Sequence, residues 1–129
     1  MSKNIEQTVI IKASAHDVYE ALMDSKKHAE FTDAEAKISR EVGGKIQAWG
    51  DYIEGENLEL VPDKKIVQKW RASDWPNGHY STVTFALAEK DGQTELKFTQ
   101  ENVPPDEKEA IAEGWEDYYW KPLKEYFKK

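Results

Sequence analysis

Residues 81–101 read STVTFALAEKDGQTELKFTQE. The pair Asp91-Gly92 in the middle is typical of a two-residue β-hairpin turn, in which both residues adopt positive φ angles. On either side of the pair, apolar residues alternate with polar ones: Val83, Phe85, Leu87, Leu96 and Phe98. Because alternate residues of a strand face the same side of a sheet, the pattern predicts antiparallel strands over 81–90 and 93–101 with these side chains on the core face.

The segments before this hairpin predict more strands of the same sheet. Tight turns are indicated at Gly43-Gly44, Gly50-Asp51 and Pro62-Asp63. We expect a bulge at Gly55, and Ser14 is a favourable N-cap for the first of two short helices. The predicted strands cover 5–12, 34–42, 45–49, 52–61 and 65–71, and the short helices cover 15–24 and 25–31.

The C-terminal residues predict one long amphipathic helix. Asp106 and Glu109, after Pro104-Pro105, have the spacing of a capping box, and the helix could extend for about 22 residues. Pro122 should kink it, because proline lacks the N–H that would bond to an earlier carbonyl. A sheet with one apolar face needs a cover. The element order therefore predicts an α+β helix-grip fold, with about six to seven antiparallel strands wrapped around this helix and residues 1–129 in one domain.

Composition limits the partners and the location that the chain can be expected to have. The formal net charge of −7 opposes binding to nucleic acid or to an anionic membrane surface, since both need positive charge. The absence of cysteine excludes disulfides and thiolate metal sites. No apolar run resembles a signal peptide or a membrane span. We expect a cytoplasmic protein without nucleic-acid or membrane partners.

The predicted long helix carries a broad aromatic stripe. On a wheel of 100° per residue it consists of Ile111, Gly114, Trp115, Tyr118, Tyr119, Pro122 and Tyr126. The stripe is either plain core or the wall of an apolar pocket between helix and sheet, where tyrosine hydroxyls would orient a ligand. The candidate residues lining that pocket are Trp70, Phe85, Phe98, Trp115, Tyr118 and Tyr119.

The segment around residues 70–79 supplies candidates for the pocket rim. These are Arg71, Trp75 and His79. Arg71 would bind a ligand carboxylate at the rim, or it would pair with a nearby acid at the surface.

A different flank of the long helix carries Trp120, Leu123 and Phe127 at i, i+3 and i+7. Trp120 lies nearly opposite Ile111 on the wheel, so this flank is a candidate partner surface with Trp120 as its anchor. The alternative is that the flank packs against a sheet edge or a loop.

The sequence shows no pattern for catalysis or for metal binding. His16, His28 and His79 lack metal-ligand spacing, and His16 and His28 are expected at the surface. There is no P-loop, no GxGxxG motif and no spacing that assigns an acid/base pair. We therefore expect a non-enzymatic chain without catalytic residues, metal or cofactor.

Spaced motifs occur along the whole chain: Ile11-Lys12-Ala13-Ser14, Gly43-Gly44-Lys45, Trp49-Gly50, Lys69-Trp70-Arg71, Trp75-Pro76-Asn77-Gly78-His79, Asp91-Gly92-Gln93-Thr94-Glu95-Leu96, Val103-Pro104, Gly114-Trp115 and Tyr118-Tyr119. Together they resemble the C-terminal domain of the activators of the heat shock protein 90 ATPase. The resemblance implies a START-like fold of the SRPBCC superfamily, in agreement with the element order.

The resemblance also implies two functions. One is a co-chaperone or stress-related binding module with heat shock protein 90 as partner. The other is a carrier or sensor of a small hydrophobic ligand in the cavity between helix and sheet. A START-like enzyme acting on a hydrophobic substrate is a third alternative, and it would require a titratable group facing that cavity.

Overall fold

The computed structural model describes residues 3–32, 35–48, 52–73, 75, 79–104 and 107–127. The strands are β1 (Lys3–Ile11), β2 (Ala36–Ile38), β3 (Lys45–Ala48), β4 (Ile53–Val61), β5 (Lys65–Ala72), β6 (Ser81–Lys90) and β7 (Gln93–Val103). The helices are α1 (Ala15–Met23), α2 (Ser25–Thr32), α3 (Lys108–Trp115), the π-helical η2 (Glu116–Trp120) and α4 (Lys121–Tyr126). Within the described ranges, no helix is long and apolar enough to cross a membrane.

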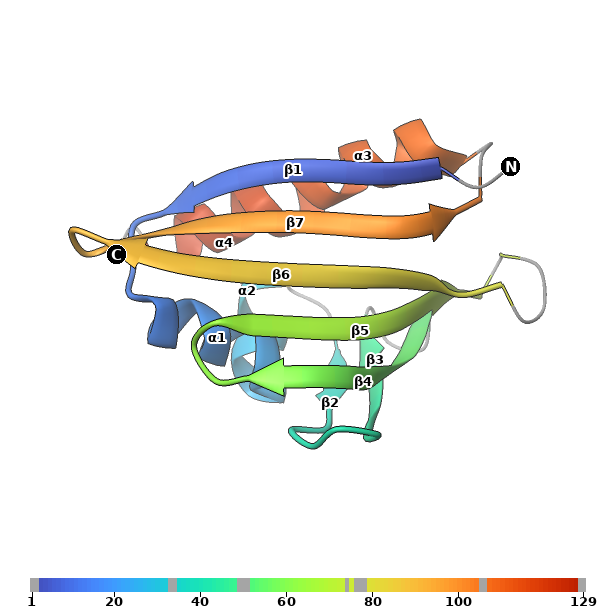
Figure 1. Cartoon of the computed structure of the whole chain (residues 1–129), viewed down its shortest axis with the longest axis horizontal. Helices are drawn as coiled ribbons and strands as arrows, with labels where there is room; N and C mark the ends of the chain where they lie inside the picture. The colour runs from blue at the N-terminus through green and yellow to red at the C-terminus, as the bar shows by residue number, and fades with distance from the viewer. Residues whose placement is uncertain are drawn as a thin grey trace.

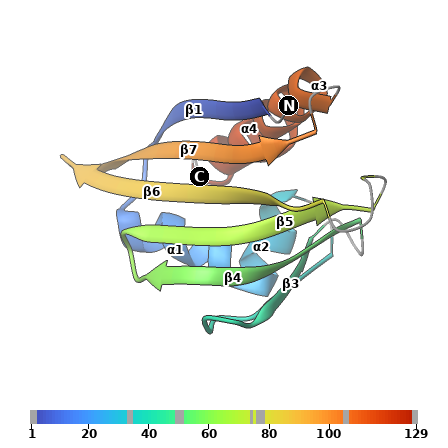
Figure 2. The same cartoon turned by 45° about the vertical axis from the view of Figure 1, so that its right-hand side comes forward.

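The strands form one seven-stranded antiparallel sheet in the order β1-β7-β6-β5-β4-β3-β2. Figures 1 and 2 show all helices on the same side of this sheet, with α3 and α4 beside β1 and β7 and with α1 and α2 beside β4 to β6. Burial alternates along β5, β6 and β7, because every second side chain points to the helices. The predicted helix-grip fold is confirmed.

The hairpin of β6 and β7 forms as its sequence predicts. Phe85 lies opposite Phe98, and Leu87 lies opposite Leu96. Asp91 and Gly92 have φ angles of 55° and 79°, as a two-residue hairpin turn requires.

The strand predicted over 34–42 is shorter than expected, because β2 ends at Ile38. The loop that follows is held by the fully buried Asn57, whose amide donates to the carbonyls of Ser39 at 2.7 Å and Glu41 at 3.0 Å. These bonds satisfy backbone groups that a longer β2 would have paired in the sheet. The outer ends of two predicted strands, at Ala34 and Trp49, lie outside the described residues.

The β-bulge of β4 lies between Asn57 and Glu59 rather than at Gly55. Gly55 is needed for a different reason, since a Cβ atom there would stand 1.9 Å from the carbonyl oxygen of Lys69 on the neighbouring strand. A side chain at this position would push β4 and β5 apart.

We predict that Gly55→Ala lowers the free energy of unfolding by about 1–3 kcal/mol, the usual cost of overpacking a close contact. Gly114→Ala is the matched control. Its Cβ would meet no atom nearer than 3.9 Å, and alanine in a helix interior is favoured over glycine by roughly 0.5–1 kcal/mol. Urea titration should show a lower free energy of unfolding for Gly55→Ala and a higher one for Gly114→Ala. An unchanged free energy of unfolding for Gly55→Ala would contradict the close contact between β4 and β5.

The C-terminal helix extends from Lys108 to Tyr126, but it is not α-helical throughout. At the end of η2 the backbone N–H of Lys121 donates to the carbonyl of Glu116, five residues earlier. The helix is therefore interrupted by a π-helical segment just before Pro122 rather than by a kink at Pro122. Pro122 itself lies in the first turn of α4, where a missing N–H costs little. The predicted cap, Asp106, lies outside the described residues.

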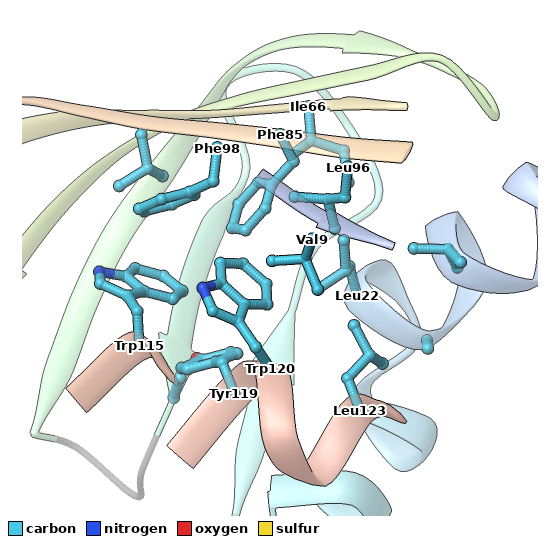
Figure 3. Close-up of a cluster of buried hydrophobic side chains, with 14 of the residues drawn as sticks. Val9, Leu22, Ile66, Phe85, Leu96, Phe98, Trp115, Tyr119, Trp120 and Leu123 are labelled. Carbon is cyan, nitrogen blue, oxygen red and sulfur yellow. The ribbon is translucent and has the colours of Figure 1, made fainter. Parts of the chain in front are cut away.

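The π-helical segment changes which side chains face the sheet. A π-helix turns each residue by less than 100°, so side chains after it rotate relative to an unbroken α-helix. Trp120 and Leu123 are 3% and 0% exposed, whereas Tyr118 is 61% exposed. Figure 3 shows Trp120 and Leu123 pointing toward the buried side chains of the sheet. The helical wheel is wrong for Trp120, because it assumes a constant 3.6 residues per turn.

Candidate functional site

An open cavity of about 400 Å³ lies between α3 and the ends of β4 and β5. This volume is in the range that holds small ligands. Tyr52 and Tyr118 stand at its mouth, 44% and 61% exposed. The full lining is Tyr52, Ile53, Trp70, Ala72, Trp75, Gln100, Glu107, Ala110, Ile111, Gly114, Trp115, Tyr118 and Tyr119.

The cavity brings together most of the residues that the sequence suggested for it. Trp70, Trp115, Tyr118 and Tyr119 lie on its walls. Phe85 and Phe98 are not among its described lining residues, because they lie beneath the Trp115 ring, with ring centroids 5.9 and 4.2 Å from it. Figure 3 shows Phe85 and Phe98 on the sheet and Trp115, Tyr119 and Trp120 on the helix. These two phenylalanines therefore belong to the hydrophobic core and not to the cavity wall.

The three predicted rim residues lie in different environments. Trp75 lines the cavity and is 7% exposed. Arg71 lies between Trp70 and Ala72, which both line the cavity, so its side chain points to the other face of the sheet. There it donates to the carbonyl of Trp75 and stands 3.8 Å from the Glu54 carboxylate. The expectation that Arg71 holds a ligand carboxylate is therefore wrong. The alternative, in which Arg71 pairs with a nearby acid, fits its contact with Glu54.

His79, the third rim candidate, is outside the cavity wall as described. Its Nε2 donates to the carbonyl of Asn102 at 2.9 Å, and its ring meets the ring of Trp75 edge to face at 5.8 Å. His79 thus packs behind Trp75, where it supports the wall without facing the cavity.

Glutamine side chains fix the orientation of the buried indoles. Trp70 donates to Gln68 at 2.7 Å, and Trp115 donates to Gln100 at 2.8 Å. The Gln100 amide in turn donates to Ser81 at 2.8 Å. Sequence reasoning missed these glutamines, although each stands at an inward position of its strand, where a polar residue signals a buried hydrogen bond.

A buried histidine lies behind Tyr119. His28, which the sequence placed at the surface, is only 4% exposed. Its Nδ1 donates to the carbonyl of Leu22 at 3.1 Å, so its Nε2 accepts from the Tyr119 hydroxyl at 3.0 Å. Burial lowers the pKa of His28 to about 4, partly offset by the bond to the Leu22 carbonyl. The imidazole is therefore neutral at pH 7 and acts as an acceptor for Tyr119.

The flank proposed as a partner surface is largely buried. Trp120 and Leu123 are in the core, and Trp120 donates its indole N–H to Gln7 of β1 at 2.7 Å. Phe127 is half-buried against Tyr126. The prediction of an exposed Trp120 anchor is wrong, because η2 rotates this flank toward the edge of the sheet. Its alternative of packing at a sheet edge fits the structure.

These features define a class of protein: a helix-grip domain with an open, aromatic-walled cavity and, within the described residues, no cluster of His, Cys, Asp or Glu that could hold a metal ion. The family model described as Activator of Hsp90 ATPase homolog 1-like protein matches residues 12–128. The chain belongs to this family.

Curated relatives agree with this assignment. The chain is 35% identical over 114 residues to the human protein named Activator of 90 kDa heat shock protein ATPase homolog 1, a match that covers 88% of this chain and 34% of the human one. The homolog from Dictyostelium discoideum is 34% identical over 116 residues, with 88% and 30% covered. The chain spans about a third of the length of the curated relatives it matches.

Solved structures show the same fold. The crystal structure of an HSP90 activator from Plasmodium falciparum superposes with a TM-score of 0.84 at 29% identity, covering 90% of this chain and 89% of that one. A protein from Mesorhizobium loti superposes with a TM-score of 0.82 at 20% identity, covering 96% of each chain. At that identity the second likeness concerns the fold alone.

Proposed function

We propose that this chain is a non-enzymatic, cytoplasmic binding module whose partner is the heat shock protein 90 chaperone. The observation that carries the proposal is its membership of a family whose relatives are named as activators of that chaperone's ATPase. An activator raises the activity of another protein, so it needs a docking surface and no catalytic group of its own. We infer that residues 1–129 act as a single domain in this role.

The surface that best suits docking is the mouth of the cavity. Tyr52 and Tyr118 are both exposed there and flank the apolar wall formed by Ile111. Exposed aromatic side chains beside an apolar hollow are typical of interaction sites, where a partner's side chain fills the hollow. This surface replaces the flank around Trp120 as the proposed contact.

We predict that Tyr118→Ala weakens binding to heat shock protein 90 by about tenfold, the effect of a moderate hot-spot residue. Val42→Ala is the control, because Val42 is also strongly exposed, at 64%, but lies in the loop between β2 and β3. Isothermal titration calorimetry against the chaperone measures both. If Tyr118→Ala binds the chaperone as tightly as the unaltered chain does, the cavity mouth is not part of the interface.

A second candidate function is a carrier or sensor of a small hydrophobic ligand. The specific observation in its favour is the open cavity of about 400 Å³, which side chains leave unfilled. Native mass spectrometry of the protein from its own cells should then show a bound small molecule that Gly114→Leu displaces. A single mass equal to that of the bare chain, in both variants, would contradict this function.

A further inference from the structure

Aromatic side chains make up much of the cavity lining. Of its 13 described lining residues, 6 are tryptophan or tyrosine. The rings of Trp70, Trp115 and Tyr119 pack against one another with centroids 4.5–6.1 Å apart and planes tilted by 36–56°. The face of an aromatic ring carries partial negative charge and attracts cations within about 6 Å of its centroid.

Four of the lining side chains use their hydrogen-bond donors within the protein. The indole N–H groups of Trp70 and Trp115 donate to Gln68 and Gln100, and the Tyr119 hydroxyl donates to His28. The amide of Gln100 donates to Ser81. These four side chains therefore offer a carboxylate ligand no free donor to replace its hydration.

The charge of the lining has the same sign as the ring faces. Glu107 is the one carboxylate among the described lining residues, and none of those residues is Lys, Arg or His. The neighbouring cation, Arg71, is held on the other face of the sheet beside Glu54. The net charge of −7 adds a long-range field that concentrates cations near the protein.

We propose that the cavity recognises an organic cation, namely an apolar body that carries a quaternary or tertiary ammonium group. The ammonium group lies against the aromatic faces near Glu107, and the apolar body contacts Ile111 and Ala110. The proposal rests on the ligand-binding function given above as the second candidate, and it names the chemical class of that ligand.

The test compares choline with 3,3-dimethyl-1-butanol, in which a neutral carbon replaces the ammonium nitrogen without changing the shape. Both are titrated into the ¹⁵N-labelled full chain, with the indole N–H resonances of Trp70, Trp75 and Trp115 as the readout. Choline should bind about tenfold more tightly than the alcohol. Glu107→Gln should weaken choline binding by about threefold and leave the alcohol unchanged, whereas Glu109→Gln, an exposed carboxylate of α3 outside the described lining, should change neither.

The outcomes separate this inference from the function on which it rests. If the alcohol binds the cavity as tightly as choline, the cation preference is overturned while the apolar carrier function stands. If neither compound shifts the cavity resonances, the cation preference is overturned, and the carrier function is decided by the native mass spectrometry described above. If Glu109→Gln weakens choline binding as much as Glu107→Gln, general attraction to an acidic surface explains the binding and the proposed site is overturned.

Discussion

Replacement of Trp120 by alanine is expected to lower the free energy of unfolding by about 3–5 kcal/mol, the usual cost of removing a large aromatic side chain from a core. Trp120 is 3% exposed and packs against the rings of Phe98 and Trp115 at 5.3 and 5.4 Å. The substitution also removes the hydrogen bond that ties the helix to Gln7 of the edge strand β1. Urea titration followed by far-ultraviolet circular dichroism measures the change.

Tyr118→Ala is the matched control for this effect. It removes an aromatic side chain two positions earlier on the same helix, but Tyr118 is 61% exposed, so the free energy of unfolding should change by no more than about 0.5 kcal/mol. An unbroken α-helical wheel predicts the opposite ranking. A larger loss for Tyr118→Ala than for Trp120→Ala would therefore rule out the π-helical register of η2.

The second large effect is a loss of stability in mild acid that depends on His28. Its folded pKa of about 4 lies below the ordinary value of 6.5, so the unfolded chain binds the proton more tightly. The stabilisation is complete above pH 6.5 and is lost as the pH falls toward 4. At 1.36 kcal/mol per pKa unit, the total loss is about 3 kcal/mol.

The contribution of His28 is isolated by comparison with His28→Gln, since carboxylates also titrate in this range. The variant should be less stable at pH 7, because glutamine cannot replace both the bond to Leu22 and the bond from Tyr119. Its stability should then fall less steeply between pH 6.5 and 4. If the free energy of unfolding falls with the same slope for His28→Gln and for the unaltered chain, His28 titrates normally in the folded state.

The fold could be predicted from sequence because its strongest signals are local. The turn at Asp91-Gly92 and the alternation around it determine the register of β6 and β7, and each further turn adds an antiparallel neighbour. The aromatic cluster on the long helix likewise indicated which element covers the sheet. Such signals depend on backbone geometry within a few residues, which the sequence shows directly.

The parts of the site that could not be predicted depend on contacts between distant segments. His28 looks like a surface residue because α2 is short and polar, and it is buried only where Tyr119, 91 positions later, packs over it. The rotation of Trp120 into the core depends on η2, which a wheel of constant pitch cannot show. The inward glutamines Gln68 and Gln100 were detectable, since polar residues interrupt apolar positions of β5 and β7.

The proposed interface between this chain and heat shock protein 90 is the mouth of the cavity. The most direct measurement is a titration of the ¹⁵N-labelled chain with the unlabelled chaperone, with backbone amide and indole N–H resonances recorded by NMR. We expect saturable changes at the resonances of Tyr52, Trp75 and Tyr118 and none at Val42. An absence of changes, or changes confined to the loop around Val42, would contradict it.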